Sequence, residues 1–372
     1  MGAAWYSAVP AHRTPTVSPV EVHVMARNIV VFLPNWIGDT VMATPTLRAV
    51  HKHFGPAATI TGVMKPYVQK VLDGTPWLHQ ILLFDRKSSD PRLRLWSVAR
   101  ELRRIRPQVA MYLSSSWLPA LMGWWSGAKQ RVACVRGGRS WLLTHRVPRS
   151  SAAPISDVDR FLQLAYAVGC PCEERRLELA VSGEEERGAQ TVWRNLGLEA
   201  YRHVVLFNVG SAQGRARHWP DEHYMDLARR ILKLPGTAIL LLCGPREQEA
   251  AAGLERRIAD PRVRSMASQD LSLGTAKACI RRGRLLVTTD SGPRHIAAAF
   301  RIPTVVMFGP IDSRRTVNYN PCEVAVRNPV PCQPCNQHSC PLQHNACMRD
   351  LHPERVFQAV APLLTAASQQ AA

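Results

Sequence analysis

Short apolar runs alternate with amphipathic stretches along this chain from residue 29 onward, and this rhythm limits the folds that it can adopt. Each apolar run predicts a strand, and the runs lie at 29–33, 58–63, 81–84, 109–113, 203–208, 237–243, 262–266, 285–288 and 303–308. Strands that alternate with helices build parallel sheets from βαβ units. The sequence therefore predicts an α/β protein.

A polar stretch at 173–187 interrupts the rhythm before it resumes. The chain has 372 residues, more than one hydrophobic core usually serves. Two doubly wound, Rossmann-like halves, 25–181 and 182–372, fit this length better than one large sheet. Residues 1–24 contain three prolines and lack the apolar core of a signal peptide. We expect them to be a disordered extension, or a mis-assigned start that precedes Met25.

The net charge is +19, from 47 Lys and Arg against 28 Asp and Glu. Such an excess favours polyanions, anionic membrane surfaces or phosphorylated substrates over neutral partners. Apolar runs stay far below the ~20 residues that a membrane span needs, so a soluble protein is expected. Because an export signal is not apparent, we expect a cytoplasmic location and ten cysteines that are mostly thiols.

Residues 289–295, Thr-Asp-Ser-Gly-Pro-Arg-His, directly follow one of the predicted strands. Gly292 would let a phosphate approach the backbone closely, and Pro293 suits the first turn of a helix. Free N–H groups at such a junction bind anions. The next strand ends in Gly309-Pro310, so two phosphate-accepting loops are expected at one sheet edge, where ligands of open α/β sheets bind. A capped turn is the alternative interpretation.

Two other strand ends carry candidate functional groups. The first strand leads into Pro-Asn-Trp-Ile-Gly-Asp (34–39), which places Asp39 near a helix N-terminus. The helix dipole should keep this carboxylate ionised and able to act as a general base, although an N-capping Asp is the simpler interpretation of the motif taken alone. The strand at 203–208 leads into a glycine-rich loop with Arg215, Arg217 and His218, followed by a helix from Asp221. That loop suits a diphosphate, or is simply a basic surface loop.

Taken in order, these motifs resemble the ADP-heptose:lipopolysaccharide heptosyltransferases of glycosyltransferase family 9, and within it the heptosyltransferase II branch. The resemblance spans roughly residues 25–360. It rests on PNWIGD (34–39), the segment ending in HWP (218–220), DSGPRH (290–295), FGP (308–310) and a cysteine cluster followed by Met348. It implies a GT-B fold, in which two Rossmann-like domains face a cleft. It also implies inverting transfer of heptose from an ADP-activated donor to the lipopolysaccharide inner core, with no cofactor required for catalysis.

The same resemblance assigns roles to individual residues. Asp39 is expected to deprotonate the acceptor hydroxyl. The donor nucleotide sugar is expected to contact Gly210, Ser211, Arg217, Gly244, Glu247, Asp290, Ser291, Gly292 and His295. Arg217 departs from the family, which commonly has Lys before the Trp-Pro, and its planar fork alters the donor geometry. The expected acceptor is lipid A/Kdo or a heptosylated inner core, met on the inner face of the cytoplasmic membrane by a peripheral enzyme.

Four cysteines, Cys332, Cys335, Cys340 and Cys347, follow a C-x2-C-x4-C-x6-C spacing in a Pro-rich segment (332–347) that precedes a predicted C-terminal helix. Four soft ligands could close a tetrahedral zinc site, but free thiols or a facultative disulfide fit the same spacing. In each case the segment is expected to be a structural staple rather than the reaction centre.

The region 114–146 interleaves aromatic and basic residues, namely Trp117, Trp124, Trp125, Trp141, Lys129, Arg131, Arg136, Arg139 and Arg146. This composition suits a lipid-linked acceptor or an anionic membrane, and also single-stranded nucleic acid. A basic zinc-containing nucleic-acid-binding protein is therefore an alternative, as is a GT-B transferase with another sugar or acceptor. We expect no nucleic-acid partner, because nucleic-acid binding leaves the glycine-rich loops at strand ends in both halves unexplained.

Overall fold

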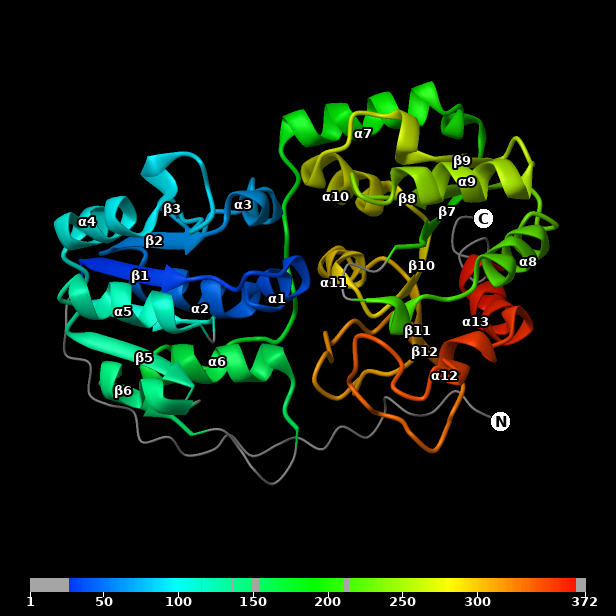
Figure 1. The fold of residues 1–372 in the computed structure, drawn as a ribbon. Coiled ribbons are helices and arrows are strands. Elements are labelled where there is room, and N and C mark those ends of the chain that lie inside the picture. The colour runs from blue at the N-terminus through cyan, green and yellow to red at the C-terminus, as the bar shows by residue number, and fades with distance from the viewer. Residues whose placement is uncertain (1–26, 115, 135–136, 149–153, 211–213, 366–372) are drawn as a thin grey trace.

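The computed structural model of this protein describes residues 27–114, 116–134, 137–148, 154–210 and 214–365. These residues form two halves, each built on a six-stranded parallel sheet that helices cover (Figure 1). None of the helices in these ranges combines the length and the apolar character needed to span a bilayer.

The N-terminal half has the strand order β3-β2-β1-β4-β5-β6. Its strands are β1 (Asn28–Phe32), β2 (Thr59–Met64), β3 (Gln80–Leu83), β4 (Val109–Tyr112), β5 (Gln130–Cys134) and β6 (His145–Val147). Its helices are α1 (Ile37–Met42), α2 (Thr44–Phe54), α3 (Pro66–Leu72), α4 (Leu95–Ile105), α5 (Trp117–Trp125) and α6 (Asp157–Ala167), with 3₁₀ turns at Pro91–Leu93 and Gly137–Leu142. The central strand β1 is almost wholly buried, which explains its continuous apolar sequence.

The C-terminal half has the order β12-β11-β10-β7-β8-β9. Its strands are β7 (His203–Asn208), β8 (Thr237–Leu242), β9 (Val263–Ser265), β10 (Leu285–Thr289), β11 (Thr304–Phe308) and β12 (Glu323–Arg327). Its helices are α7 (Gly183–Asn195), α8 (Asp221–Ile231), α9 (Gln248–Ile258), α10 (Leu273–Arg282), α11 (Gly292–Ala299), α12 (Ala346–Arg349) and α13 (Pro353–Thr365). Counted from its first strand, each sheet has the doubly wound order 3-2-1-4-5-6. The predicted α/β class with two Rossmann-like halves is confirmed.

All nine predicted strands are present, and their ends agree within about one residue. The sequence did not reveal β5, β6 and β12. These strands are short and carry charged residues such as Arg131, Arg146 and Arg327, because they lie toward or at the sheet edges, where burial is incomplete. Their apolar signal is correspondingly weak.

The chain crosses from one half to the other between α6 and α7 (Figure 1). Ser182 and Glu185 form a capping box that starts α7, so the last residues of the polar stretch are helical. Arg48 of α2 pins the crossover segment, because its guanidinium donates to the backbone oxygens of Glu174 (2.8 Å) and Arg176 (3.0 Å). We propose that the domain boundary lies near Val181.

The two halves touch through α1 against α11 and α3 against α10. A Cβ atom on Gly38 would lie 2.8 Å from Cδ2 of His295, so this close approach of the halves requires glycine. The Asp157 N–H also donates to the Arg315 backbone oxygen at 2.9 Å. These contacts bring the loop after β1 against the loop after β10, which is where the predicted motifs lie.

Candidate active site

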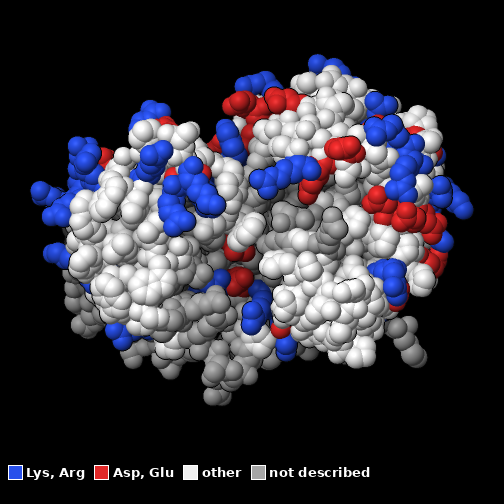
Figure 2. All heavy atoms as spheres, viewed as in Figure 1, with Lys and Arg blue, Asp and Glu red and all other residues white. Residues whose placement is uncertain are grey.

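Asp39 is the third residue of α1, the helix that packs against α11 of the other half. Acidic and basic side chains gather in the hollow between the two halves (Figure 2). Burial raises the pKa of its carboxyl group to about 7. Repulsion from Asp157 and Asp290 adds to the rise, and Arg160 opposes it. The expectation that the helix dipole keeps Asp39 fully ionised is therefore wrong, because desolvation outweighs the dipole of a six-residue helix.

The Asp39 carboxylate is open to a ligand. Within the described chain, its pKa is shaped by burial and by charges at a distance rather than by any hydrogen bond. Arg160, the cation that lowers the Asp39 pKa, is itself paired with Asp157 at 2.6 Å. A carboxylate whose pKa lies near the working pH and whose oxygens are unoccupied is well suited to take a proton from a hydroxyl group.

Asn208, the last residue of β7, ties the two donor-side loops together. Its amide nitrogen donates to the Gly210 backbone oxygen (3.2 Å) and to the hydroxyls of Thr288 (3.1 Å) and Ser291 (3.1 Å). The sequence analysis did not single out Asn208. The signal that could have identified Asn208 is a polar residue at the end of an otherwise apolar strand.

The N-terminus of α11 is free to bind an anion. Ser291 precedes the helix, but its hydroxyl donates to the Thr289 backbone oxygen (3.2 Å) and contacts Thr288 instead of capping the helix. The first N–H groups of α11, starting at Gly292, therefore keep their capacity for an external acceptor. The anion cradle at this helix N-terminus stays a prediction.

A buried ion-pair network supports the loop after β10. Arg294 is fully buried and donates to the Asp290 carboxylate (2.6 Å) and, through a two-pronged contact, to Glu323 (2.7 and 2.9 Å). The Arg217 guanidinium donates to the Asp290 backbone oxygen at 2.9 Å. The Asp290 carboxylate thus holds Arg294 in place. Sequence reasoning missed Arg294 and Glu323, although Arg294 lies one helical turn after Asp290.

His295 is buried where α11 meets Gly38, and burial together with Arg294 lowers its pKa to about 3. It is therefore neutral at physiological pH, and any contact with a donor diphosphate would come from a neutral ring. Its Nδ1 atom has no hydrogen-bond partner among the described residues.

Three further predicted donor residues meet at the ends of β7 and β8. The Gly244 N–H donates to the Glu247 carboxylate at 3.0 Å. A Cβ atom on Gly210 would lie 1.9 Å from the same carboxylate, so Glu247 lies directly against the Gly210 backbone. Ser211, also predicted, lies outside the described residues.

The structure gives no support to the expectation that the Gly309-Pro310 loop accepts phosphate, because both residues are buried. Gln333 donates to the Gly309 oxygen (2.8 Å), and the Asn336 N–H donates to the Pro310 oxygen (2.8 Å). A Cβ atom on Gly309 would lie 2.4 Å from the Met348 sulfur. The segment after β12 folds back and covers this loop, so Gly309 serves close packing.

The Cys-rich segment braces the donor side of the site. The His338 backbone oxygen accepts a hydrogen bond from Ala216 in the glycine-rich loop at 3.1 Å. Its cysteines Cys332, Cys335, Cys340 and Cys347 are free thiols, and burial, then the other three cysteines, raises the pKa of Cys347 to about 11. Across the described ranges, no three His, Cys, Asp or Glu side chains are arranged to hold a metal ion. The structure therefore does not support the zinc site that the spacing allowed as one alternative.

A hollow of about 400 Å³ opens at the carboxyl ends of β1 to β4, beside the loop that carries Asp39. Its lining includes Lys65, Arg86 and Lys87, together with Asp85 and Trp117. No ion pair with another described residue neutralises the three cations. The sequence analysis missed them, although each follows a strand of the N-terminal sheet.

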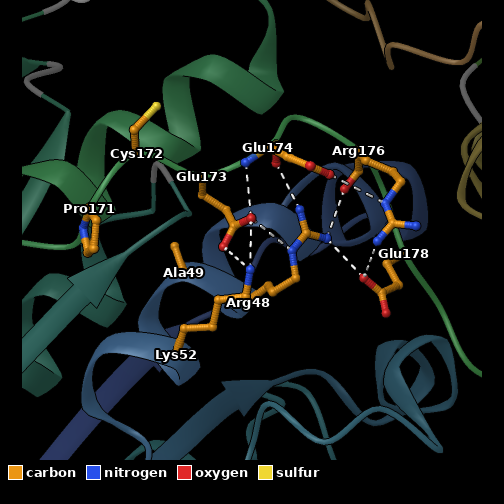
Figure 3. Close-up of a pocket in the computed structure, with 9 residues that line it drawn as sticks. All are labelled: Arg48, Ala49, Lys52, Pro171, Cys172, Glu173, Glu174, Arg176 and Glu178. Atoms are coloured by element: carbon orange, nitrogen blue, oxygen red, sulfur yellow. Dashed lines mark hydrogen bonds and ion pairs between the residues drawn. The ribbon is translucent and has the colours of Figure 1, made fainter.

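A second hollow, of about 530 Å³, lies where α2 meets the crossover segment (Figure 3). Its charged groups satisfy one another: Arg48 pairs with Glu173 (3.2 Å) and Glu178 (3.1 Å), and Lys52 pairs with Glu173 (2.8 Å). We interpret this hollow as the anchor of the crossover rather than as a ligand site.

The chain matches the sequence profile of glycosyltransferase family 9 (heptosyltransferase) over residues 95–346. It belongs to that family. Lipooligosaccharide heptosyltransferase 2 of Campylobacter jejuni is 24% identical over 90% of this chain and 98% of its own length. Lipopolysaccharide heptosyltransferase 2 of Escherichia coli K12 is 26% identical over 76% of this chain and 82% of its own.

The solved structure of the E. coli ADP-heptose lipopolysaccharide heptosyltransferase II superposes with a TM-score of 0.77 at 23% identity, covering 92% of this chain and 99% of that one. The predicted GT-B fold and the resemblance to family 9 are thereby confirmed, and the chain is a glycosyltransferase by family. Family membership favours the enzyme over the nucleic-acid-binding alternative.

Proposed function

We propose that this family 9 protein is an inverting heptosyltransferase that transfers heptose from ADP-heptose to the inner core of lipopolysaccharide, with Asp39 as general base. One observation carries the proposal. Asp39, a carboxylate with a pKa of about 7, lies between an anion-binding helix N-terminus in one half and a basic hollow in the other. The relatives named heptosyltransferase 2 support the choice of sugar and acceptor.

In the proposed reaction, an acceptor hydroxyl oxygen attacks the anomeric carbon of the donor while its proton passes to the Asp39 carboxylate. The bond from that carbon to the diphosphate oxygen breaks, and its electron pair leaves with ADP. Base and leaving group are held by opposite halves of the molecule, which favours attack from the face opposite the diphosphate. A single displacement of this kind inverts the anomeric configuration.

The donor would lie along the loops after β7, β8 and β10, on Gly210, Ser211, Gly244, Glu247, Ser291 and Gly292. Arg217 and the N-terminus of α11 would stabilise the charge that develops on departing ADP. Because these groups supply positive charge themselves, we expect turnover to persist in the presence of a chelator.

The acceptor would occupy the hollow beside Asp39, where Lys65, Arg86 and Lys87 suit a phosphate or carboxylate substituent of an inner-core sugar. Tyr67 lies at the same edge, and its hydroxyl donates to the Asn35 backbone oxygen. Because such an acceptor is lipid-linked, we propose that the enzyme works as a peripheral protein on the inner face of the cytoplasmic membrane.

The test combines a donor screen with two variants. Calorimetry with ADP-heptose, ADP-glucose, UDP-sugars and GDP-sugars should favour ADP-heptose, and NMR of the product should show inversion. Asp39→Asn should lower kcat by about 10²-fold or more while ADP affinity is kept. Tighter binding of another nucleotide sugar would instead support a different GT-B transferase.

Arg217→Ala should weaken ADP binding by about 1 to 3 kcal/mol, the scale of a lost charge-assisted bond. Arg217→Lys keeps the charge and should lose less. Arg256→Ala, an exposed position on α9 of the same half, is the matched control and should bind ADP normally. Equal ADP affinity in all three variants would show that Arg217 is misassigned.

A further inference from the structure

The outward face of α5 is unusually apolar for a solvent-exposed helix. Trp117, Leu121 and Trp124 follow an i, i+4, i+7 spacing, which places them on one face, and they are 51%, 39% and 47% exposed. Large aromatic side chains gathered on a surface mark a place where something binds.

Neighbouring elements extend this face. Trp141, in the turn Gly137–Leu142, is 61% exposed and meets Trp124 edge to face with ring centroids 6.3 Å apart. Trp96, at the start of α4, is 69% exposed and meets Trp125 in the same way at 6.0 Å. We call Trp96, Trp117, Leu121, Trp124 and Trp141 the aromatic face.

Basic residues flank the aromatic face on α4. Arg100, Arg103 and Arg104 are exposed there, and the Arg103 guanidinium lies 5.4 Å from the Trp125 ring. In Figure 2 the area over α5 is largely uncharged, with Lys and Arg side chains along its outer edge. Aromatic groups beside arginines are typical of surfaces that enter the headgroup layer of a bilayer.

The structure also changes which basic residues of 114–146 are available. Arg131 is turned inward, where it donates to the backbone oxygens of Leu142 (2.6 Å) and Ala128 (2.6 Å). Arg136 lies outside the described residues, as does the side chain of Arg139. Lys129 and Arg146 stay exposed, and α4, a helix that the sequence analysis did not consider, adds further arginines beside the aromatic face.

We propose that the aromatic face inserts into the headgroup layer of an anionic bilayer and thereby holds the basic hollow of the N-terminal half against its lipid-linked acceptor; the second clause rests on the proposed function. The link is α5 itself. Trp117, Leu118 and Pro119 line that hollow, so the helix that would enter the membrane also forms a wall of the acceptor site. Exposed arginines on α4 would add electrostatic attraction to anionic headgroups.

The test uses the full chain with the double substitution Trp124→Ser and Trp141→Ser, which leaves the residues lining the hollow intact. Flotation with vesicles of phosphatidylglycerol and phosphatidylcholine should show that the double variant binds at least about tenfold more weakly than the wild type, because two indoles no longer enter the interface. The matched control is Leu342→Ser, which removes a 59% exposed apolar side chain from the other half and should bind vesicles normally.

Two substrate forms separate docking from chemistry. Turnover on a delipidated core oligosaccharide should be unchanged in the double variant, while turnover on the same acceptor embedded in vesicles should fall. Vesicle binding that survives the double substitution would overturn the proposal. The proposal would also be overturned if the wild type is a dimer that the double substitution dissociates while vesicle binding is kept. The aromatic face would then be the contact between two copies of the chain. Vesicle binding is measured without any sugar substrate. It would therefore still test the membrane proposal if the proposed transferase activity were not found.

Discussion

Asp39 combines a chemical advantage with a cost to the fold. Its raised pKa means that the native state holds the neutral carboxyl more readily than the unfolded chain does. The ionised form, which the proposed general-base step needs, is therefore the form that the fold tolerates less well. Residues that weaken the fold and serve the reaction are expected at active sites.

The pH dependence of turnover follows from this pKa. Asp39 must be deprotonated to accept a proton, so kcat/KM should be level above pH 7 and fall about tenfold per pH unit below it. Initial rates with a soluble acceptor between pH 5 and 9 would measure the profile. A midpoint near 4 would mean that the base is an ordinary exposed carboxylate.

Stability should respond to pH in the opposite sense. For a carboxyl with a raised native pKa, the unfolded state loses its proton first as pH rises, so the native state loses relative stability from about pH 4 and the loss is complete above pH 7. Asp39→Asn removes this penalty and should raise the melting temperature at pH 8, with little effect near pH 3.5. Calorimetry at the two pH values checks this, and a lower melting temperature at pH 8 would contradict it.

At the scale of elements, the sequence predicted the central strands and the strand-to-helix junctions, because buried parallel strands are continuously apolar and junctions that bind anions need glycine. Short charged strands such as β12 gave no comparable signal. The Asp39 pKa was also out of reach, because it depends first on burial in the folded chain and then on Asp157 and Asp290, which are distant in sequence. The packing of Met348 against Gly309 could not be predicted either, because it depends on how the segment after β12 folds back.

The brace between the Cys-rich segment and the glycine-rich loop can be tested at one atom. Gly214 has φ of +106°, and a Cβ atom there would lie 2.3 Å from the His338 oxygen. Gly214→Ala should therefore displace the loop and raise the donor KM about tenfold, the scale of local backbone strain, with acceptor KM unchanged. Gly253→Ala, in the open on α9, is the control and should leave both constants unaltered.

Across the whole molecule, Lys277 acts as a latch between the halves. From α10 it donates to the backbone oxygens of Lys70 (3.1 Å) and Asp73 (3.1 Å) at the end of α3, while pairing with Glu185 at 3.1 Å. The ammonium group thus satisfies carbonyls that the helix end would otherwise leave unpaired.

Lys277→Met combined with Glu185→Gln should free this latch without leaving a buried charge unpaired. Glutamine can still complete the capping box of α7. Small-angle scattering should show a larger radius of gyration in the ligand-free variant, which ADP-heptose reduces toward the wild-type value. An unchanged radius would mean that α1 and α11 alone keep the halves together.

The neighbours of Asp39 come from both halves, and this has a consequence for timing. Burial is the largest cause of the raised Asp39 pKa, and the repulsion that adds to it comes from Asp157 of the N-terminal half and Asp290 of the other. When the halves separate, water reaches the carboxylate and its proton affinity drops toward that of an ordinary aspartate. Full basicity is thus acquired only on closure, so an open enzyme that has loaded its donor would have little power to activate a stray water and waste the sugar by hydrolysis.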